Sequence, residues 1–555
     1  MFTIQQLGVS VRDSYGSCRK HLLREISFRL PAGHFAAIVG PSGCGKSTLV
    51  KALLGLHRPD EGRVFVEGLD LQAHLPYLLP EIGYVPQFSI AHEELTVVEA
   101  LDFAARLRLP GNWSARHRSE RLVEVLEEVE MRQTLHTRVG FLSGGQKRRL
   151  SLAMELLRNP PILIMDEVTS GLDAHSEKKF MELFARLAHQ YGKTVICVTH
   201  NVEHLSLCDS ILVLREGRLA FHGDLPALRE RFGVESAFGL YARLEEMNEA
   251  ELETPGIPEV TEGRSMEFAP LPSPVSQWWT LLSRQMLLFF RNPTQVILQA
   301  VLILGFPFLV VVFAYDGLPQ VTSMSLTLSR DIFQDMQEQI QYARSSIRIA
   351  TLASGLVMFQ VILLTLMGSN NGAREIVKER PIYEKERLAG VSPLAYLCSK
   401  TVFVCLLSLI QAGVMLALVR YYCRFPGDWM VQYCLLALAT AAMSMTCLMF
   451  SAFFRSTEQS SLVSIYLVGL QLPLSGAVLA LPAWLLIFTQ PLIDAYWAWS
   501  GFIRTFTQDR VYDVIAANTK TSLASPETAL LVLGLHFVFC FIAAYVCVKK
   551  VQSPS

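Results

Sequence analysis

Hydrophobic residues are distributed unevenly along this chain of 555 residues. Residues 1–270 alternate short apolar runs with polar stretches, which is typical of a water-soluble domain. Residues 294–550 instead contain repeated apolar runs, each near the roughly 20 residues that a helix needs to cross a bilayer. The pattern therefore predicts a soluble domain followed by a membrane domain.

The apolar runs predict six membrane-spanning helices. They lie at roughly 294–315, 349–369, 401–420, 430–453, 460–481 and 528–548. The fifth run is the least distinct at its end. A re-entrant segment at Pro482 and residues 484–488 is the alternative there. Lys549 and Lys550 follow the last span, and loop 370–400 is also basic, so both are expected on the cytoplasmic side. The segments 316–348 and 489–527 are then expected outside.

Two segments connect the soluble domain, 1–243, to the membrane domain, 294–555. Residues 244–275 are acidic and contain proline, which predicts a linker. Residues 276–293 are amphipathic and aromatic, and they predict a connecting helix along the inner membrane face. Packing of this helix against the soluble domain is the alternative, and the two are compatible.

The soluble domain contains a glycine-rich loop between an apolar strand, 34–39, and a helix that begins near residue 48. Backbone N–H groups of such a loop and the helix N-terminus bind phosphates. In this pattern Lys46 reaches the outer phosphates and the Ser47 hydroxyl binds Mg²⁺, so ATP and Mg²⁺ are the expected ligands. The ATP-binding residues predicted here are Gly40, Pro41, Ser42, Gly43, Cys44, Gly45, Lys46, Ser47 and Thr48.

A second apolar strand, 161–165, ends in Asp166 and Glu167. Asp166 is the candidate ligand of Mg²⁺, either directly or through water. Glu167 is the candidate general base, or water-orienting carboxylate, for attack on the γ-phosphate. A solvated strand end is the alternative, and the position before Ser170-Gly171-Leu172-Asp173 makes it the weaker one.

Three further features complete the candidate site. His200 directly follows the strand 194–199 and can contact the γ-phosphate. Gln87 lies on a loop where it can touch Mg²⁺ or the attacking water. A lone His or Gln is more often structural, so both assignments rest on order and spacing. The third feature is the pentapeptide at a predicted helix start, Leu142, Ser143, Gly144, Gly145 and Gln146.

These residues together resemble the ATPase domain of ABC transporters. The resemblance implies a Walker A loop at 40–47, a Q-loop at Gln87, a signature at 142–146, a D-loop containing Asp173 and a switch His200, with Tyr15 as the candidate for stacking on adenine. In that family the signature caps the γ-phosphate held by the opposite domain. The resemblance therefore implies that two chains associate, as a homodimer with two intact sites or, alternatively, as a heterodimer.

The order of the domains, the fragments 95–101 and 107–110, and the charged run 374–396 resemble the G subfamily of ABC transporters. The resemblance implies ATP-driven export of lipids or other hydrophobic or amphipathic compounds, with loop 370–400 carrying movement to the spans. It also suggests a substrate path near Phe359, Gln360, Gln471 and residues 475–478, for which helix packing is an equal alternative. The implied fold class is an α/β P-loop ATPase domain with a helical subdomain, followed by an all-α domain of six transmembrane helices.

Composition narrows the remaining possibilities. The net charge of −1 gives no basic field that would favour a nucleic-acid partner. The eleven cysteines show no metal-binding spacing. The N-terminus has no signal-peptide pattern, so the ATPase domain is expected in the cytoplasm, at a plasma membrane or a bacterial inner membrane. A membrane-anchored ATPase with a signalling role and an importer subunit are the alternative functions.

Overall fold

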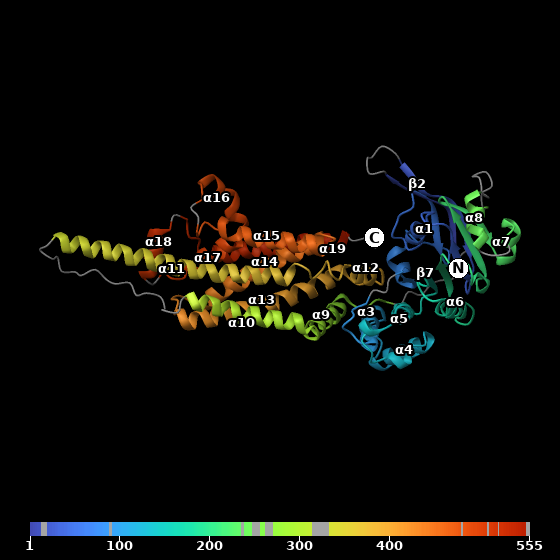
Figure 1. Cartoon of the computed structure of the whole chain (residues 1–555), viewed down its shortest axis with the longest axis horizontal. Coiled ribbons are helices and arrows are strands. Elements are labelled where there is room, and N and C mark those ends of the chain that lie inside the picture. The colour runs from blue at the N-terminus through green and yellow to red at the C-terminus, as the bar shows by residue number, and fades with distance from the viewer. Residues whose placement is uncertain are drawn as a thin grey trace. The chain divides into compact units, whose positions relative to one another are not determined.

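The computed structural model describes residues 1–12, 19–87, 91–234, 238–246, 256–260, 270–313, 332–478, 481–507, 510–519 and 521–550. These residues form two compact units. Unit 1 comprises Met1–Thr280 together with Pro381–Ser392, and unit 2 comprises Leu281–Arg380 and Pro393–Val551. The strands all belong to unit 1, and the long helices in yellow to red belong mainly to unit 2 (Figure 1).

Unit 1 is built on two sheets. A six-stranded sheet has the order β10-β9-β3-β8-β7-β6, and a four-stranded antiparallel sheet has the order β2-β1-β4-β5. In the larger sheet β3, β6, β7, β8 and β9 pair in parallel, and β10 is antiparallel to β9. The strands are β1 (Phe2–Arg12), β2 (Arg19–Leu30), β3 (Phe35–Val39), β4 (Glu61–Val66), β5 (Leu69–Asp70), β6 (Ile82–Val85), β7 (Ile162–Asp166), β8 (Thr194–Val198), β9 (Ser210–Arg215) and β10 (Arg218–Gly223).

The central parallel strands explain why the candidate site assembles. Every residue of β3 and β8 is buried, as expected for strands covered on both faces. Parallel strands share one carboxyl edge, so the segments that follow β3, β6, β7 and β8 meet there. The predicted ATP-binding and catalytic residues come from these segments.

Several helices of unit 1 begin at a residue whose side chain caps the helix. Thr96 and Glu99 form a capping box at the start of α3, and Ser143 and Gln146 form another at the start of α5. The helices are α1 (Lys46–Leu53), α2 (Leu75–Leu78), α3 (Val97–Arg108), α4 (Ala115–Glu128), α5 (Gly144–Leu156), α6 (Ala174–His189), α7 (Leu225–Phe232), α8 (Phe238–Glu246) and α12 (Arg380–Leu388), and α9 (Pro274–Arg291) begins in this unit.

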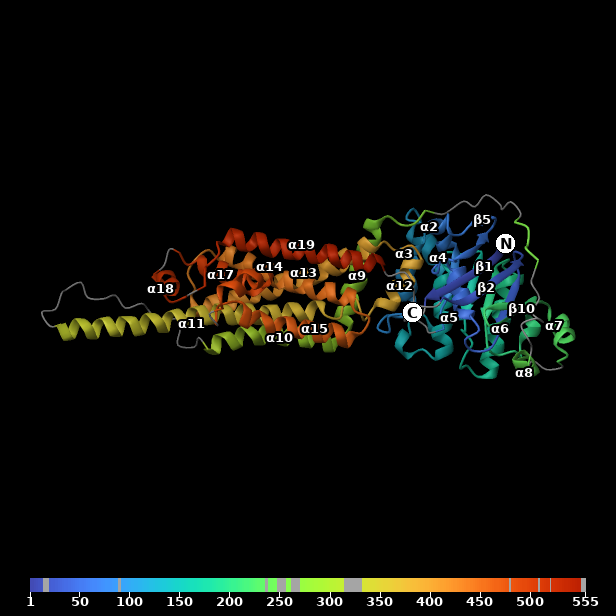
Figure 2. The same ribbon diagram turned by 90° about the horizontal axis from the view of Figure 1, so that it is seen from above.

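Unit 2 is an all-helical bundle. Helices α11, α13, α14 and α19 run alongside one another in both views (Figures 1 and 2). Its helices are α10 (Pro293–Phe313), α11 (Ile332–Gly372), α13 (Pro393–Cys423), α14 (Trp429–Phe453), α15 (Thr457–Leu474), α16 (Ala483–Thr489), α17 (Asp494–Arg504), α18 (Arg510–Asn518) and α19 (Pro526–Lys550). The parallel sheet of unit 1 and the helices of unit 2 confirm the predicted fold class.

Five helices in the described part of the chain are long and apolar enough to cross a membrane: α10, residues 339–372 of α11, α13, α14 and α19. They fall at five of the six predicted spans. The remaining predicted span, 460–481, corresponds to α15, whose first residues 457–461 are polar. This sixth span stays a prediction.

Part of the segment 489–527 is a buried helix of unit 2, and its expected place outside the membrane stays a prediction. Helix α17 lies within 489–527, and Trp499 on it is fully buried. The indole Nε1 of Trp499 donates a hydrogen bond to Ser354 Oγ of α11 at 3.1 Å. Aromatic residues at helical spacing drive this packing, which a hydropathy scan for long apolar runs does not detect.

Three spans are joined by a closed ring of amide hydrogen bonds. Gln299 of α10 donates to Asn371 Oδ1 of α11 at 3.1 Å, Asn371 donates to Gln411 Oε1 of α13 at 2.9 Å, and Gln411 donates to Gln299 Oε1 at 3.0 Å. All three side chains are buried. Each amide therefore satisfies its neighbour, and the ring fixes the register of α10, α11 and α13.

Glycines allow α11 to approach α14 closely. A Cβ atom at Gly368 would lie 2.6 Å from the carbonyl oxygen of Thr440, and one at Gly372 would lie 2.2 Å from that of Ser444. Small residues four positions apart are a common way for membrane helices to pack backbone against backbone.

We expect Gly372→Ala to destabilise the protein by about 1–3 kcal/mol, because the added methyl group has no room against α14. Gly355→Ala on the same helix is the matched control, since a Cβ atom there has no neighbour within 4 Å. Thermal unfolding of both variants in detergent measures the difference. Equal melting temperatures for the two variants would contradict this account of the packing.

Candidate ATP site

The glycine-rich loop lies between β3 and α1, as predicted. Gly45 caps α1 with a φ of +106°, and a Cβ atom there would lie 2.9 Å from Leu23 Cδ2. Both the backbone conformation and the close neighbour require glycine at this position. The N-terminus of α1 therefore faces the loop without a side chain that would obstruct an anion.

The loop lysine is positioned by the loop itself. Lys46 is 5 % exposed, and its Nζ donates hydrogen bonds to the carbonyl oxygens of Gly40 at 2.7 Å and Pro41 at 3.0 Å. Carbonyl oxygens are neutral, so the ammonium keeps its full charge for an anionic ligand. Cys44 is buried beneath the loop, and burial raises the pKa of its thiol.

Both carboxylate oxygens of Glu167 are held by predicted site residues. Gln87 Nε2 donates to Oε2 at 3.0 Å, and His200 Nε2 lies 2.6 Å from Oε1. The φ of Glu167 is +50°, a conformation that costs a non-glycine residue on the order of 1 kcal/mol, and its N–H is fixed by the carbonyl oxygen of Val198 at 3.0 Å. The structure thus brings together three residues that come from different parts of the sequence.

Asp166, the last residue of β7, lies beside Glu167 and accepts a hydrogen bond from Tyr84 Oη at 3.2 Å. Burial raises the pKa of Asp166, and the neighbouring carboxylate of Glu167 adds to this, although the bond from Tyr84 opposes it. The sequence did not indicate Tyr84. Its role depends on the pairing of β6 with β7, which is visible in the fold alone.

An open cleft of about 720 Å³ joins the loop to Glu167 and His200. The loop residues that line it are Ser42, Gly43, Gly45, Lys46, Ser47 and Thr48. Residues of β2 also line it, namely Lys20, His21, Leu22 and Arg24, and the sequence analysis missed them. Tyr15, the candidate for stacking on adenine, lies outside the described residues.

The signature residues occupy a different place. Ser143 caps α5, and both Ser143 and Gly144 are exposed. Within the described residues, none of Leu142 to Gln146 lines the cleft that contains Lys46 and Glu167. Asp173 of the D-loop caps α6, where its Oδ1 accepts the N–H of Ser176 at 2.9 Å. Within the described residues, the cleft and the start of α5 are therefore separate features of unit 1.

The residues expected to bind Mg²⁺ suit a nucleotide-bound ion. No cluster of three or more His, Cys, Asp or Glu side chains that could hold a metal occurs among the described residues. Mg²⁺ in nucleotide sites is commonly held by one or two carboxylates together with phosphates and water. Ser47 lines the same cleft as Glu167, and Asp166 and Gln87 adjoin Glu167. These residues fit a Mg²⁺ ion that binds with its nucleotide.

Comparison with known proteins finds two family matches in the chain. Residues 23–170 match the family described as ABC transporter, and residues 276–498 match the family described as ABC-2 type transporter. The chain is 30% identical over 477 residues to the ABC transporter ATP-binding/permease protein Rv1747 of Mycobacterium tuberculosis, which covers 83% of this chain and 53% of that protein. It therefore spans about half the length of Rv1747.

Two further comparisons concern the ATPase half. The chain is 38% identical over 221 residues to the Nod factor export ATP-binding protein I of Rhizobium sp. (strain N33), covering 40% of this chain and 71% of that protein. It aligns with the dimeric structure of a post-hydrolysis state of the ATP-binding cassette MJ0796 bound to ADP and Pi, with a TM-score of 0.37, 28% identity, and coverage of 40% of this chain and 99% of that one.

The fold, the cleft and the sequence matches define an ATPase of the ABC class. The chain belongs to the ABC transporters. Its ATPase domain comes first and its ABC-2 membrane domain second, which is the order of half-transporters like those of the G subfamily.

We expect Tyr84→Phe to shift the acid limb of the ATPase pH profile to higher pH. The substitution removes a hydrogen bond that lowers the pKa of Asp166, so this carboxyl group takes up its proton at a higher pH and then binds Mg²⁺ poorly. At low pH the Mg²⁺ concentration for half-maximal activity should rise about threefold. Tyr191→Phe, at an exposed tyrosine, is the control, and a profile for Tyr84→Phe that superimposes on that control would refute the role of Tyr84.

Proposed function

We propose that this chain is one half of an ATP-driven exporter that works as a dimer with two composite ATP sites. The observation that carries the proposal is the separation of the signature from the cleft of its own chain, within the described residues. A γ-phosphate bound at Lys46 would then be capped by the signature of a second chain. A homodimer would contain two intact sites of this kind, and a heterodimer is the alternative.

The start of α5 is suited to such a partner. This helix is 13 residues long, so its N-terminus carries the partial positive charge of a helix dipole. Ser143 and Gly144 at this end are exposed, and glycine leaves the backbone N–H groups accessible. An ATP molecule held between two chains would stabilise the closed pair, because it binds that state better than the open one.

Hydrolysis would take place at Glu167. Its carboxylate would orient the attacking water and accept the proton of that water, and bound Mg²⁺ would neutralise charge on the phosphates. Gln87 and His200 hold the two carboxylate oxygens, so both are placed to move when the γ-phosphate arrives or departs. The loop that contains α12 would carry this change to the spans.

The proposed cargo is a lipid or another hydrophobic or amphipathic compound. The ABC-2 match and the export named for the Nod factor relative support outward transport. Helices α10 and α19 each present large exposed apolar side chains, including Leu304 and Phe308 on α10 and Phe539 on α19, that suit contact with membrane lipids. We place the protein in a plasma membrane or a bacterial inner membrane with its ATPase domain in the cytoplasm.

We expect Glu167→Gln to reduce ATP turnover by about 10²- to 10⁴-fold while ATP binding persists, because the amide cannot accept a proton. Steady-state phosphate release and nucleotide binding by the purified full chain provide the two measurements. Glu182→Gln on α6 is the control, since Glu182 is exposed and is not among the residues that line the cleft. Turnover that survives in Glu167→Gln would exclude the proposed chemistry.

Transport is tested separately from hydrolysis. In liposomes we expect at least one compound from a panel of lipids and amphipathic drugs to stimulate ATP hydrolysis and to move across the membrane in an ATP-dependent direction. Stimulated hydrolysis without movement of any stimulating compound would favour a membrane-anchored signalling ATPase instead.

A further inference from the structure

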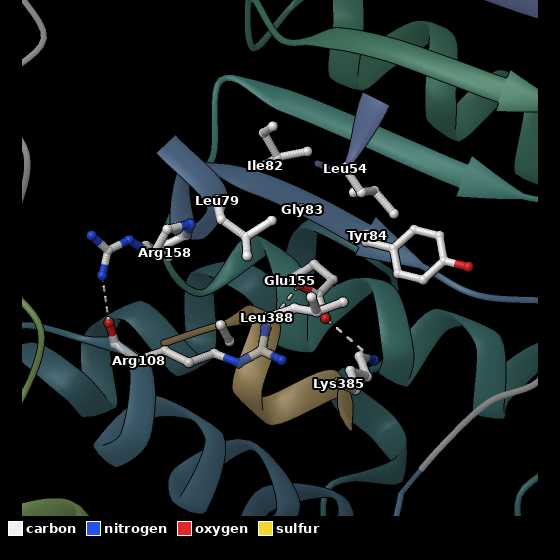
Figure 3. Close-up of a pocket in the computed structure, with 12 residues that line it drawn as sticks. Leu54, Leu79, Ile82, Gly83, Tyr84, Arg108, Glu155, Arg158, Lys385 and Leu388 are labelled. Atoms are coloured by element: carbon white, nitrogen blue, oxygen red, sulfur yellow. Dashed lines mark hydrogen bonds and ion pairs between the residues drawn. The ribbon is translucent and has the colours of Figure 1, made fainter. Parts of the chain in front are cut away.

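A buried ion cluster in unit 1 joins α12 to α5. Lys385 of α12 is 8 % exposed, and its Nζ lies 3.2 Å from Glu155 Oε1 and donates to Ser151 Oγ at 3.2 Å. Arg108 at the end of α3 places Nη1 2.9 Å from Glu155 Oε2. Figure 3 shows Glu155 between the two cationic side chains, with α12 approaching α5. One carboxylate thus binds two cations from separate segments.

The ion pair of Arg108 and Glu155 does not involve α12. Arg108 Nη1 also donates to the carbonyl oxygen of Met154 at 2.8 Å, so it binds the C-terminal end of α5 twice. Burial alone would raise the pKa of Glu155, but Arg108 and Lys385 outweigh burial, and the pKa of this carboxyl is lowered. Removal of Lys385 would therefore leave Glu155 with a charged partner, and the ATPase domain would keep its own ion pair.

The ion pair of Lys385 depends more on the exact position of its partners than the ion pair of Arg108 does. Burial of an ammonium is costly unless its charge is paired and its donors are satisfied. In this site Glu155 and Ser151 meet that need, and they lie one turn apart on the same face of α5. The contact is therefore favourable when α12 is seated at one place along α5, which gives the ion pair a positional role.

A second contact fixes the other end of the same segment. Gln277 of α9 is 2 % exposed, its Nε2 donates to the carbonyl oxygen of Gly390 at 3.3 Å, and its Oε1 accepts the N–H of Ser392 at 2.8 Å. A cavity of about 20 Å³ remains between Tyr84, Leu388 and the ion cluster, which is room for about one water molecule. The segment 381–392 is thus held at two points within unit 1.

The helix that Lys385 contacts is the signature helix. Ser143 lies at its first turn and Glu155 at its last, about 18 Å apart at about 1.5 Å per residue. A helix of this length moves as one body, so a shift at Glu155 also displaces the signature. Lys385 contacts this helix through Glu155 and Ser151, and neither of these is the loop lysine or Glu167.

We propose that Lys385 is a positioning residue that fixes the position of the signature helix, α5, through Glu155 and Ser151. The loop between the spans thereby controls the ATP site whose loop lysine belongs to the partner chain. This inference rests on the proposed function, because it requires that the signature act across a dimer. The side chain of Lys385 would transmit the movement. It would act on one of the two ATP sites that each chain helps to form.

The first test compares Lys385→Met, Lys385→Arg and the control Lys378→Met in the full chain reconstituted in lipid nanodiscs. Lys378 is an exposed lysine of the same loop. We expect Lys385→Met to lower kcat for ATP about tenfold with a KM within twofold of wild type. Lys385→Arg should recover most of kcat, and Lys378→Met should match wild type. A kcat of Lys385→Met equal to wild type, or equal loss in the Met and Arg variants, would overturn the proposal.

Unfolding controls separate positioning from simple loss of structure. We expect Lys385→Met to melt near the wild-type temperature, because Arg108 still pairs with Glu155. If this variant does not fold, Ser151→Ala serves instead, since it removes one of the two contacts of Lys385. It should lower kcat about twofold to threefold with an unchanged KM, and an unchanged kcat in Ser151→Ala would overturn the proposal.

Mixed dimers locate the affected site. In the first mixed dimer, one chain is wild type and the other carries both Lys46→Ala and Lys385→Met. The remaining loop lysine then faces the altered signature helix, and we expect low activity. When Lys46→Ala and Lys385→Met are on different chains, the remaining loop lysine faces an intact signature helix, and activity should be about tenfold higher. The reverse order, or equality, would overturn the proposal. A wild-type protein without ATPase activity, or an active Glu167→Gln, would instead show that the proposed function has failed.

Discussion

The position of the α5 N-terminus, which does not line the cleft of its own chain, is the constraint on which the proposed function depends. A γ-phosphate needs hydrogen-bond donors on more than one side, and the cleft of one chain supplies those around Lys46. Ser143 and Gln146 satisfy each other in a capping box, while the exposed Gly144 leaves the helix end unobstructed. The helix end is suited to an anion, and its own chain does not bring it to the cleft. The proposed association of two chains would resolve this separation.

The same helix also explains how membrane spans can be linked to ATP. Its C-terminal end meets Arg108 and Lys385 through Glu155, so in the proposed dimer α5 would have one end that faces ATP and one end that faces the loop. Tyr84 adds a second connection, because it lines the cavity beside Lys385 and its hydroxyl donates to Asp166. In the proposed dimer, the segment 381–392 would therefore adjoin elements of both ATP sites, through α5 for one and through Tyr84 for the other. This arrangement would allow a loop between two spans to respond to the nucleotide state of the pair.

Much of this could be predicted from the sequence, for a physical reason. Parallel strands place the residues that follow them at one edge, so the order of strand and polar residue was enough to bring Glu167, Gln87 and His200 together. The ion pair of Lys385 with Glu155 could not be predicted, because the partners are far apart in the sequence and charges on a loop usually remain in water. The burial of α17 was missed because aromatic residues, and not a long apolar run, drive its packing. Tyr84 was missed because strand pairing determines its neighbour.

Activity of a mixed dimer tests the composite site most directly. One chain would carry Ser143→Arg, which blocks its signature, and the other would carry Lys46→Ala, which weakens phosphate binding at its loop. Each variant alone should form an inactive homodimer. In the mixed dimer both lesions fall in the same composite site, so the account predicts that the second site is intact and that ATP hydrolysis returns to about half the wild-type rate if the two sites act independently. A mixed dimer as inactive as either homodimer would contradict the account, because it would show that each chain uses its own signature.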